Sequence, residues 1–198
     1  MPHPNAIQSP KGRLMLVAPN NNDDKSIAIL RSHPRTRQYL LFMPEETTTE
    51  DARALRELRA QDSTMTIFHI HIANGKGSTD FVGMTGILHI DSANLSCEAG
   101  MMIMPQWHKK GIATEAFYML LQFAFEERKL HRVTFEVSAE NQPMQRWLEE
   151  VAQARLEAER KDYWRNIDGN YTDVKGYCIL EGEWRGRIRD RLLARLLS

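Results

Sequence analysis

The sequence predicts a mixed α/β domain. Segments with the 3.6-residue apolar period of helices alternate with segments that have the two-residue period of strands. Three β-rich runs follow one another in the middle of the chain, separated by Gly, Ser, Asn and Asp turns, as in an antiparallel meander. A length of 198 residues suits one domain with its own core. These observations together favour a single α/β unit over separate helical and strand domains.

The expected elements follow in order along the chain. Residues 1–12 are rich in proline and polar residues, so we expect a flexible tail and ordered structure from Arg13. Asn and Asp begin one predicted helix, and threonines ahead of acidic residues begin the next, as helix caps do. The predicted elements are a strand at 13–19, helices at 20–32 and 47–60, strands at 64–73, 80–90 and 97–105, a helix after 108-HKKG-111, a strand at 132–137, a helix from about 141, a strand at 171–184 and an amphipathic basic helix from about 185.

The segment between the first two helices, 38-QYLLFMPEE-46, is more apolar than an ordinary linker. Its Tyr39, Phe42 and Met43 are candidates for binding a substrate. Packing into the core is the alternative, and the residues alone leave both open.

Composition excludes some classes of function. Lys plus Arg and Asp plus Glu each number 26, so the formal net charge is zero and no global field favours nucleic acid or an anionic membrane. The two cysteines, Cys97 and Cys178, are too few and too far apart for a disulfide framework. No stretch has the apolar length of a membrane helix or the pattern of a signal peptide. We expect a cytoplasmic protein.

The segment 105-PQWHKKGIATEA-116 opens a helix between two predicted strands. The first N–H groups of a helix have no partner within it, and this end carries a partial positive charge. Lys109 and Lys110 add full charges at the same place. Gly111 and Ala113 keep bulk away, so that a phosphate can approach the backbone. These residues predict a pyrophosphate site, with an ordinary solvated helix start as the alternative.

The run 108-HKKGIATEA-116 resembles the acetyl-CoA signature Q/R-x-x-G-x-G/A of the GNAT acetyltransferase superfamily. It is most similar to the branch of ribosomal-protein N-terminal acetyltransferases (RimJ/RimL-like), where P-x-x-W-G-x-G-x-A-T-E-A is common. In this chain His108 stands for the Trp and Lys109 for the first glycine. Three further blocks resemble that branch in order, and the similarity covers roughly residues 13–184: 98-EAGMMIMP-105, 141-NQPMQRWLEEVAQARLEAERKDYW-164 and 173-DVKGYCILEGEW-184.

The resemblance implies the GNAT fold, a mixed and mostly antiparallel sheet of about six to seven strands flanked by helices, with residues 13–198 as one domain. It implies that the strand before the cofactor helix splays from the strand after it, and that acetyl-CoA lies in the gap. It also implies that a helix ends near Gln153 and a strand begins near Arg155, although residues 149–161 look continuously helical. The residues implied to bind acetyl-CoA are Met102, Ile103, Met104, His108, Lys109, Lys110, Gly111, Ile112, Ala113, Thr114 and Asn141.

The activity implied by the resemblance is acetyl transfer from acetyl-CoA to a primary amine, on a protein N-terminus or a small molecule. The alternative is a coenzyme A-binding or interaction module of the same fold without catalysis. A homodimer is compatible with either.

Amine acetylation needs a base for the amine proton and an acid for the leaving thiolate. Glu98, on the strand just before the cofactor helix, is the first candidate for the base, and Glu136 is the second. The alternative for each is a surface carboxylate on an alternating strand. Leu148 occupies the position where many relatives have a tyrosine acid, so Tyr177 is a substitute candidate, with core packing as its alternative.

Two imidazoles on one face of a strand, in 69-HIH-71, are the only hint of a metal. No third ligand with a recognisable spacing is near them in the sequence, so we assign no metal site. Cys178 has no evident His or Asp partners and is expected to be an apolar filler.

Overall fold

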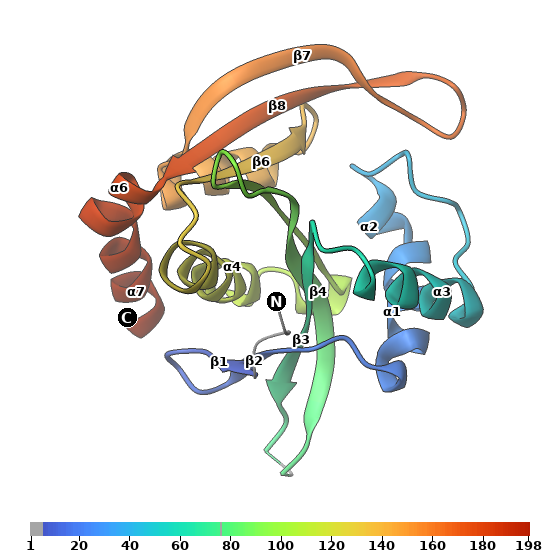
Figure 1. Ribbon diagram of the computed structural model, residues 1–198. Coiled ribbons are helices and arrows are strands. Elements are labelled where there is room, and N and C mark those ends of the chain that lie inside the picture. Colours follow the sequence, from blue (N-terminus) through green and yellow to red (C-terminus); the bar gives the residue numbers. More distant parts are fainter. Residues whose placement is uncertain (1–5, 76) are drawn as a thin grey trace.

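The computed structural model describes residues 6–75 and 77–198 and shows a twisted sheet with helices on both faces (Figure 1). The described part forms one eight-stranded sheet in the order β1-β2-β3-β4-β5-β6-β8-β7. Neighbouring strands are antiparallel except β5 and β6, which run parallel. The strands are β1 (Ile7–Gln8), β2 (Leu14–Val17), β3 (Thr66–Ala73), β4 (Thr79–Asp91), β5 (Ser96–Ile103), β6 (Arg132–Ser138), β7 (Arg155–Arg165) and β8 (Tyr171–Leu180).

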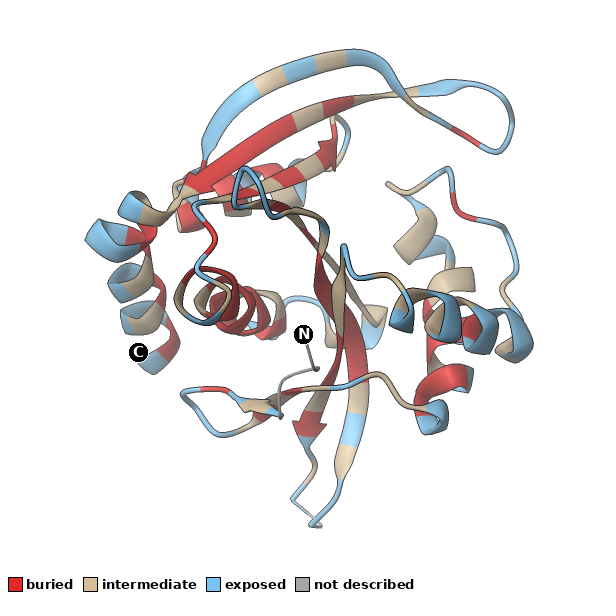
Figure 2. Ribbon diagram, in the orientation of Figure 1, coloured by how far each residue is buried: buried red, intermediate tan, exposed pale blue. Residues whose placement is uncertain are grey.

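Helices cover the two faces unequally. The main core contains the apolar faces of α4 and α7 and inward residues of β3, such as Phe68 and Ile70. α4 lies against one face of the sheet and is mostly buried (Figures 1 and 2). A smaller cluster packs α1 and α3 on the other face, where Ile27 and Leu30 contact Met84. The helices are a short 3₁₀ turn η1 (Asn21–Asp23), α1 (Asp24–Ser32), α2 (Pro34–Arg37), α3 (Thr49–Ala60), α4 (Ile112–Gln122) with a π-helical extension (Phe123–Glu127), α5 (Gln142–Arg146) with a π-helical extension (Trp147–Ala152), α6 (Glu181–Glu183), a π-helical turn (Trp184–Ile188) and α7 (Arg189–Leu197); a second 3₁₀ turn, η2 (Pro105–Trp107), precedes α4.

The ends of the chain differ from the sequence prediction. Residues 1–5 lie outside the described part, but Ile7 and Gln8 of the expected tail form β1 and pair with β2. The last strand ends at Leu180 rather than at residue 184, because the Glu183 carboxylate accepts the Leu180 N–H and caps a helix there. The C-terminal helix therefore begins at Glu181, four residues before its expected start.

The segment after α5 forms a strand, as the family resemblance implies, although its local residue pattern is typical of a helix. Gln153 has a left-handed φ of 53° and ends the helix. Ala154 donates its N–H to the Leu148 carbonyl at 2.8 Å, which completes the last turn. The following residues pair with β8, with Arg155 opposite Cys178. Ladder hydrogen bonds with a neighbouring strand thus outweigh the helix propensity of the Ala, Glu and Arg residues.

Within residues 6–75 and 77–198, none of the helices combines the length and the apolar character needed to cross a membrane.

Candidate active site

A fork in the sheet is the central feature of the site. β5 and β6 pair at only three positions, from Ser96 opposite Arg132 to Glu98 opposite Thr134. β5 then continues to Ile103 in pairing with β4 alone among the described strands. The backbone groups on its other side need hydrogen-bond partners from outside the ladder. An extended ligand can supply them by adding to the strand edge.

Strand alternation decides which groups face the fork. In an antiparallel ladder, the N–H and C=O of alternate residues point to the same neighbour. Met104 donates its N–H to the Val82 carbonyl at 2.8 Å. Met102 lies two residues earlier on β5, opposite Met84, so its N–H and C=O also point to β4. The groups that face the fork therefore belong to Met101 and Ile103. The Met102 and Met104 amides are therefore directed to β4 and not to the fork, contrary to the expectation; of the expected set only Ile103 faces the fork, together with Met101.

The loop before α4 has the backbone shape of an anion site. Lys109 and Gly111 both have left-handed φ angles, of 60° and 76°, and Gly111 is the N-cap of α4. The next residues, Ile112 to Thr114, lie in the first turn, where backbone N–H groups are unpaired within the helix. His108 fixes the loop to β5, because its Nε2 lies 2.9 Å from the Ile103 carbonyl oxygen. The helix start predicted from sequence is therefore formed at the mouth of the fork.

A basic pocket that the sequence did not reveal adjoins this loop. The buried Glu115 carboxylate accepts a hydrogen bond from Arg13 Nε at 2.7 Å, and Arg13 Nη2 donates to the Lys110 carbonyl at 3.2 Å. Arg13 thus clamps the loop to the first turn of α4. The pocket has a volume of about 270 Å³, and four of its lining residues are basic: Lys11, Arg13, Lys110 and Arg195. These residues come from three distant segments, so spacing could not show that they converge.

Two more of the predicted residues join α4 to α5. The Thr114 hydroxyl accepts from Trp147 Nε1 at 2.9 Å, and the Trp147 ring stacks on Phe117 at 4.8 Å between centroids. Asn141 is the N-cap of α5, with its side-chain oxygen accepting the Met144 N–H at 3.2 Å. The capping alternative for Asn141 is thus observed, and Trp147 in the extension of α5 contacts the first turn of α4.

Glu98 lies where the fork opens. It is the last residue of β5 that pairs with β6. Its neighbours Cys97 and Ala99 belong to the main core, so alternation places Glu98 on the opposite face, toward α1 and α3. Its Oε2 lies 3.2 Å from Nδ1 of His89, an exposed residue with a left-handed φ of 51°. His89 was not among the predicted site residues, and its position across the β4–β5 ladder has no sequence signal.

Glu136 lies on the same face of β6 and is held by an arginine. Arg160 Nη1 donates to Glu136 Oε2 at 2.7 Å. A Cβ at Gly176 would approach this nitrogen to 2.6 Å, so the glycine lets Arg160 lie across β8. Burial raises the pKa of Glu136 and the Glu98 carboxylate adds to the rise, although the Arg160 charge opposes it. Both predicted carboxylates are therefore partly buried and electrostatically coupled on one face, rather than surface groups.

Tyr177 packs into the core, which was the alternative to a catalytic role. Its ring belongs to the main core, and its hydroxyl donates to Glu149 Oε1 at 2.6 Å. Burial raises the pKa of Tyr177, and the bond to Glu149 raises it further. A hydroxyl committed in this way is poorly placed to protonate a leaving thiolate. Cys178 is buried, and burial raises its pKa to about 11, which agrees with an apolar filler.

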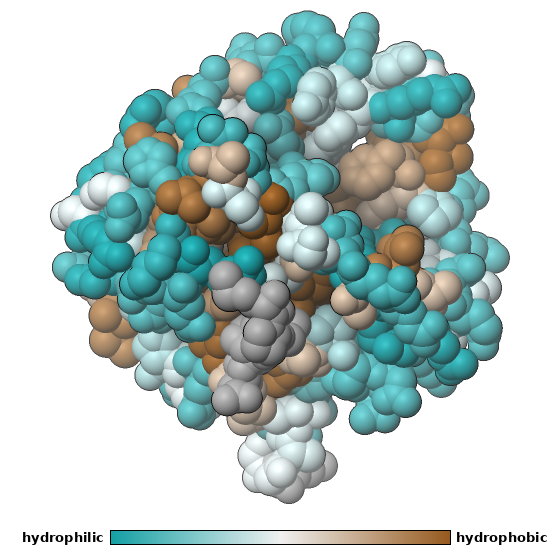
Figure 3. Space-filling model, viewed as in Figure 1, coloured by the Kyte–Doolittle hydropathy of each residue, from teal (hydrophilic) through white to brown (hydrophobic). Residues whose placement is uncertain are grey.

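The loop between α2 and α3 faces the β7–β8 hairpin. Phe42 packs edge-on against Trp164 at 5.3 Å between ring centroids. Ile167, in the hairpin turn, donates its N–H to the Leu41 carbonyl at 3.1 Å. Phe42, Leu41 and Ile167 are all exposed, and Figure 3 shows apolar surface recessed between these two segments. The loop and the hairpin thus form an apolar wall on the face that carries the two glutamates.

The other two residues predicted from this loop differ from Phe42. Met43 is buried, so it packs into the core and does not line the surface where a substrate would bind, contrary to the expectation. Tyr39 is partly exposed, and its hydroxyl accepts a hydrogen bond from Gln38 at 3.1 Å.

Comparison with known proteins identifies the family. A family model described as an acetyltransferase (GNAT) domain matches residues 13–152. The chain belongs to the GNAT acetyltransferase family. It is 25% identical over 175 residues to "Putative ribosomal N-acetyltransferase YdaF" of Bacillus subtilis (strain 168), which covers 87% of this chain and 93% of that protein. This similarity supports the RimJ/RimL-like branch.

Solved structures show the same architecture. The crystal structure of a "putative acetyltransferase" from T. thermophilus has a TM-score of 0.82 and 26% identity over 99% of both chains. A spermidine N-acetyltransferase from Vibrio cholerae, in complex with CoA and spermine, has a TM-score of 0.76 and 22% identity over 87% of this chain and 98% of that one. Within residues 6–75 and 77–198 the sheet has eight strands, one more than the upper end of the expected six to seven.

As a GNAT acetyltransferase, the protein is an N-acetyltransferase that uses acetyl-CoA. The geometry fits this cofactor. The fork exposes backbone groups of Met101 and Ile103 that an amide-bearing pantetheine arm can bind. The left-handed loop at Lys109 and Gly111 and the adjoining basic pocket suit its phosphates. When bound, acetyl-CoA supplies an activated thioester.

Proposed function

We propose that the protein transfers acetyl directly from acetyl-CoA to a primary amine at the point where β5 and β6 diverge, with Glu98 as the base. The observation that carries this proposal is the position of Glu98, the last residue of β5 paired with β6 before the strands diverge. An acceptor amine that approaches a thioester in the fork from the α1–α3 face passes this carboxylate.

Chemistry defines what the side chains must do. The neutral amine attacks, a C–N bond forms, the C–S bond of the thioester breaks, and coenzyme A leaves as a thiolate that takes a proton from solvent. Glu98 takes the amine proton, directly or through a water molecule. His89 contacts the same carboxylate and is exposed, so it can pass that proton to solvent. The N–H of Met101, the fork-side amide of β5 nearest to Glu98 beyond the point where the strands diverge, is suited to binding the thioester oxygen as negative charge develops.

Charge and apolar surface suggest the class of acceptor. Glu98 and Glu136 lie on the face of the site, and Arg160 of the hairpin strand β7 pairs with Glu136, so the Glu98 carboxylate leaves a local negative charge that favours an incoming ammonium group. The apolar wall of Phe42 and Trp164 suits an apolar group beside that amine. A protein N-terminus that begins with an apolar residue combines both features, and the similarity to YdaF supports this class. A small-molecule amine is the second class.

A turnover assay tests the proposal. Thiol release from acetyl-CoA is measured with N-terminal peptides, polyamines and free amino acids as acceptors. With the best acceptor, Glu98→Gln should lower kcat by about 10²- to 10⁴-fold and leave acetyl-CoA affinity within about threefold, because the carboxylate contacts the amine rather than the cofactor. Glu127→Gln, an exposed glutamate at the end of the α4 extension, is the matched control and should keep full activity.

Two results would contradict the proposal. Full turnover in Glu98→Gln would remove Glu98 as the base, and Glu136→Gln would then be tested in the same way. Tight acetyl-CoA binding without thiol release on any amine would favour the alternative of a coenzyme A-binding module.

A further inference from the structure

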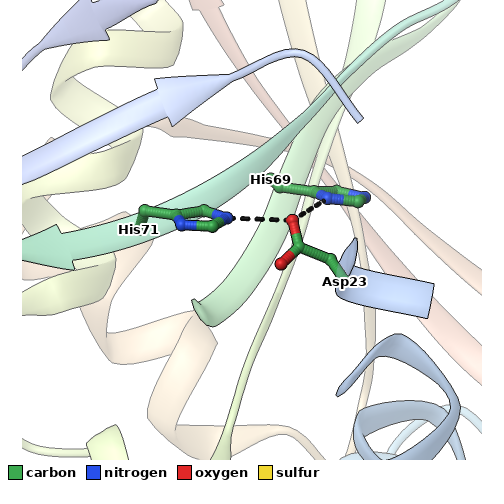
Figure 4. Close-up of side chains that lie close together, drawn as sticks. All are labelled: Asp23, His69 and His71. Carbon is green, nitrogen blue, oxygen red and sulfur yellow. Dashed lines mark hydrogen bonds and ion pairs between the residues drawn. The ribbon is translucent and has the colours of Figure 1, made fainter. Parts of the chain in front are cut away.

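The two histidines of 69-HIH-71 meet a carboxylate that the sequence did not connect with them (Figure 4). His69 Nδ1 lies 2.6 Å from Asp23 Oδ2, and His71 Nε2 lies 2.9 Å from the same oxygen. One potential ligand atom from each of the three residues lies within 4.8 Å of the other two. Asp23 ends the η1 turn, 46 residues before His69, so no short motif contains the cluster.

Local structure explains why these groups converge. Alternation along β3 sends His69 and His71 to one face while Ile70 enters the main core on the other. The register shift between Ile70 and His71 leaves Val82 of β4 unmatched, so the irregularity lies on β4 and the alternation along β3 continues through His71. Asn20 caps the η1 turn above this face and so sets Asp23 over the strand.

The surroundings resemble the outer shell of a metal site. His71 Nδ1 lies 3.0 Å from the Thr79 hydroxyl, and Asn20 Nδ2 donates to Asp23 Oδ2 at 2.9 Å. Ligating histidines usually donate their second N–H to such a partner, and ligating carboxylates are themselves hydrogen-bonded. The Phe81 ring meets both imidazoles edge-on, with centroids 5.7 and 6.0 Å away, and forms an apolar wall.

The three side chains of the cluster differ in how far they are buried. The side chains of Asp23 and His69 are 8% and 3% exposed, whereas His71 is 14% exposed. His69 also borders a pocket of about 470 Å³ between α1, α3 and β3. An ion thus has a route to a cluster that is otherwise closed, and a water molecule beside His71 can complete its coordination.

We propose that Asp23, His69 and His71 form a binding site for a divalent transition-metal ion, with zinc as the preferred ion. Two imidazoles and one carboxylate are a donor set that such ions favour, with a remaining position for water. In tetrahedral coordination, ligand atoms about 2.1 Å from zinc lie about 3.4 Å apart. The two N–O separations of 2.6 and 2.9 Å must therefore open by less than an ångström.

Binding would redistribute protons as well as move side chains. The ring nitrogens that now face Asp23 must be unprotonated to ligate, so each neutral imidazole carries its proton on the far nitrogen. For His71 that nitrogen already faces the Thr79 hydroxyl, which then accepts the N–H. The ion would join the start of α1 to β3. The site is independent of the acetyl-transfer proposal, since none of its residues belongs to the fork.

The experiment uses the full chain after treatment with EDTA and gel filtration. Zinc alone is titrated by calorimetry, and bound metal is counted after a second gel filtration. We expect one zinc ion per chain and a higher melting temperature. Cobalt in place of zinc should give visible absorption bands from its ligand field. Asp23→Asn and His71→Gln should each weaken binding at least tenfold, while His131→Gln, an exposed histidine elsewhere on the chain, should bind as wild type.

Proton NMR of the wild-type imidazoles makes the test independent of variants that fail to fold. One equivalent of zinc should shift the ring resonances of His69 and His71 and leave those of His131 unchanged. Zinc that leaves the melting curve and the His69 and His71 resonances unmoved would overturn the proposal. Equal zinc retention by a folded Asp23→Asn variant would do the same, and the cluster would then be a hydrogen-bonded triad only.

Discussion

Replacement of Lys109 tests the backbone shape of the cofactor loop. Lys109 is exposed and has a φ of 60°, at the position that corresponds to the first glycine of the acetyl-CoA signature that this segment resembles. A side-chain-bearing residue in this region costs about 1–2 kcal/mol relative to glycine. Glycine also raises the entropy of the unfolded chain, which lowers the free energy of unfolding by about 0.4–1 kcal/mol. We therefore expect Lys109→Gly to have a free energy of unfolding about 1 kcal/mol higher than Lys109→Ala, or a Tm about 2–4 °C higher.

The comparison of glycine with alanine isolates the backbone, because both variants lose the same lysine charge. Urea denaturation gives the two free energies, and calorimetric titration gives the Kd of acetyl-CoA for each. Both variants should bind acetyl-CoA more weakly than wild type if Lys109 attracts the pyrophosphate. An alanine variant as stable as the glycine variant would show that residue 109 is not held in the left-handed region, and the reasoning would fail.

Two further predictions concern groups outside the fork. Tyr177→Phe should lower the free energy of unfolding by about 1–2 kcal/mol, because the hydrogen bond to Glu149 is lost, and kcat should stay within about threefold of wild type. A hundredfold fall in kcat, together with a changed basic limb of the pH–rate profile, would restore Tyr177 as the acid. Asp24→Asn should destabilise the protein by about 2–3 kcal/mol at pH 7, because the hydrogen bond from Arg56 lowers the pKa of Asp24 despite its burial. Because folding lowers the pKa of Asp24 below its unfolded value near 3.8, the charged carboxylate stabilises the folded state fully above that pH and progressively less below it. Urea titrations should therefore show that the difference in free energy of unfolding between wild type and Asp24→Asn becomes smaller below about pH 4. A difference that does not change with pH would contradict this.

Several elements could be predicted from local pattern. The strands β3 to β6 and the helix α3 follow from apolar period and turn residues, and Thr48 forms the expected capping box with Asp51. The loop at Lys109 to Gly111 is recognisable because its residues are contiguous, so one short motif carries both the charge and the backbone freedom.

Other features depend on partners that no local pattern reveals. β7 has helical propensity, but pairing with β8 makes it a strand. Ile7 and Gln8 look like tail, but pairing with β2 orders them. Met101 rather than Met102 faces the fork, because the phase of the ladder with β4 decides which amides are free. In each case the deciding hydrogen bonds come from a neighbouring strand.

The sequence by itself determined the class of fold, the family and the position of the cofactor helix, because these depend on periodicity and on contiguous motifs. Tertiary structure alone decided which side chains meet. It brought Arg13 to Glu115 across 102 residues, Arg160 to Glu136 across 24, and Asp23 to His69 and His71 across 46 and 48. Each of these contacts places a charge beside its partner in a partly or fully buried setting, where the pairing is strong but its distance along the chain is arbitrary.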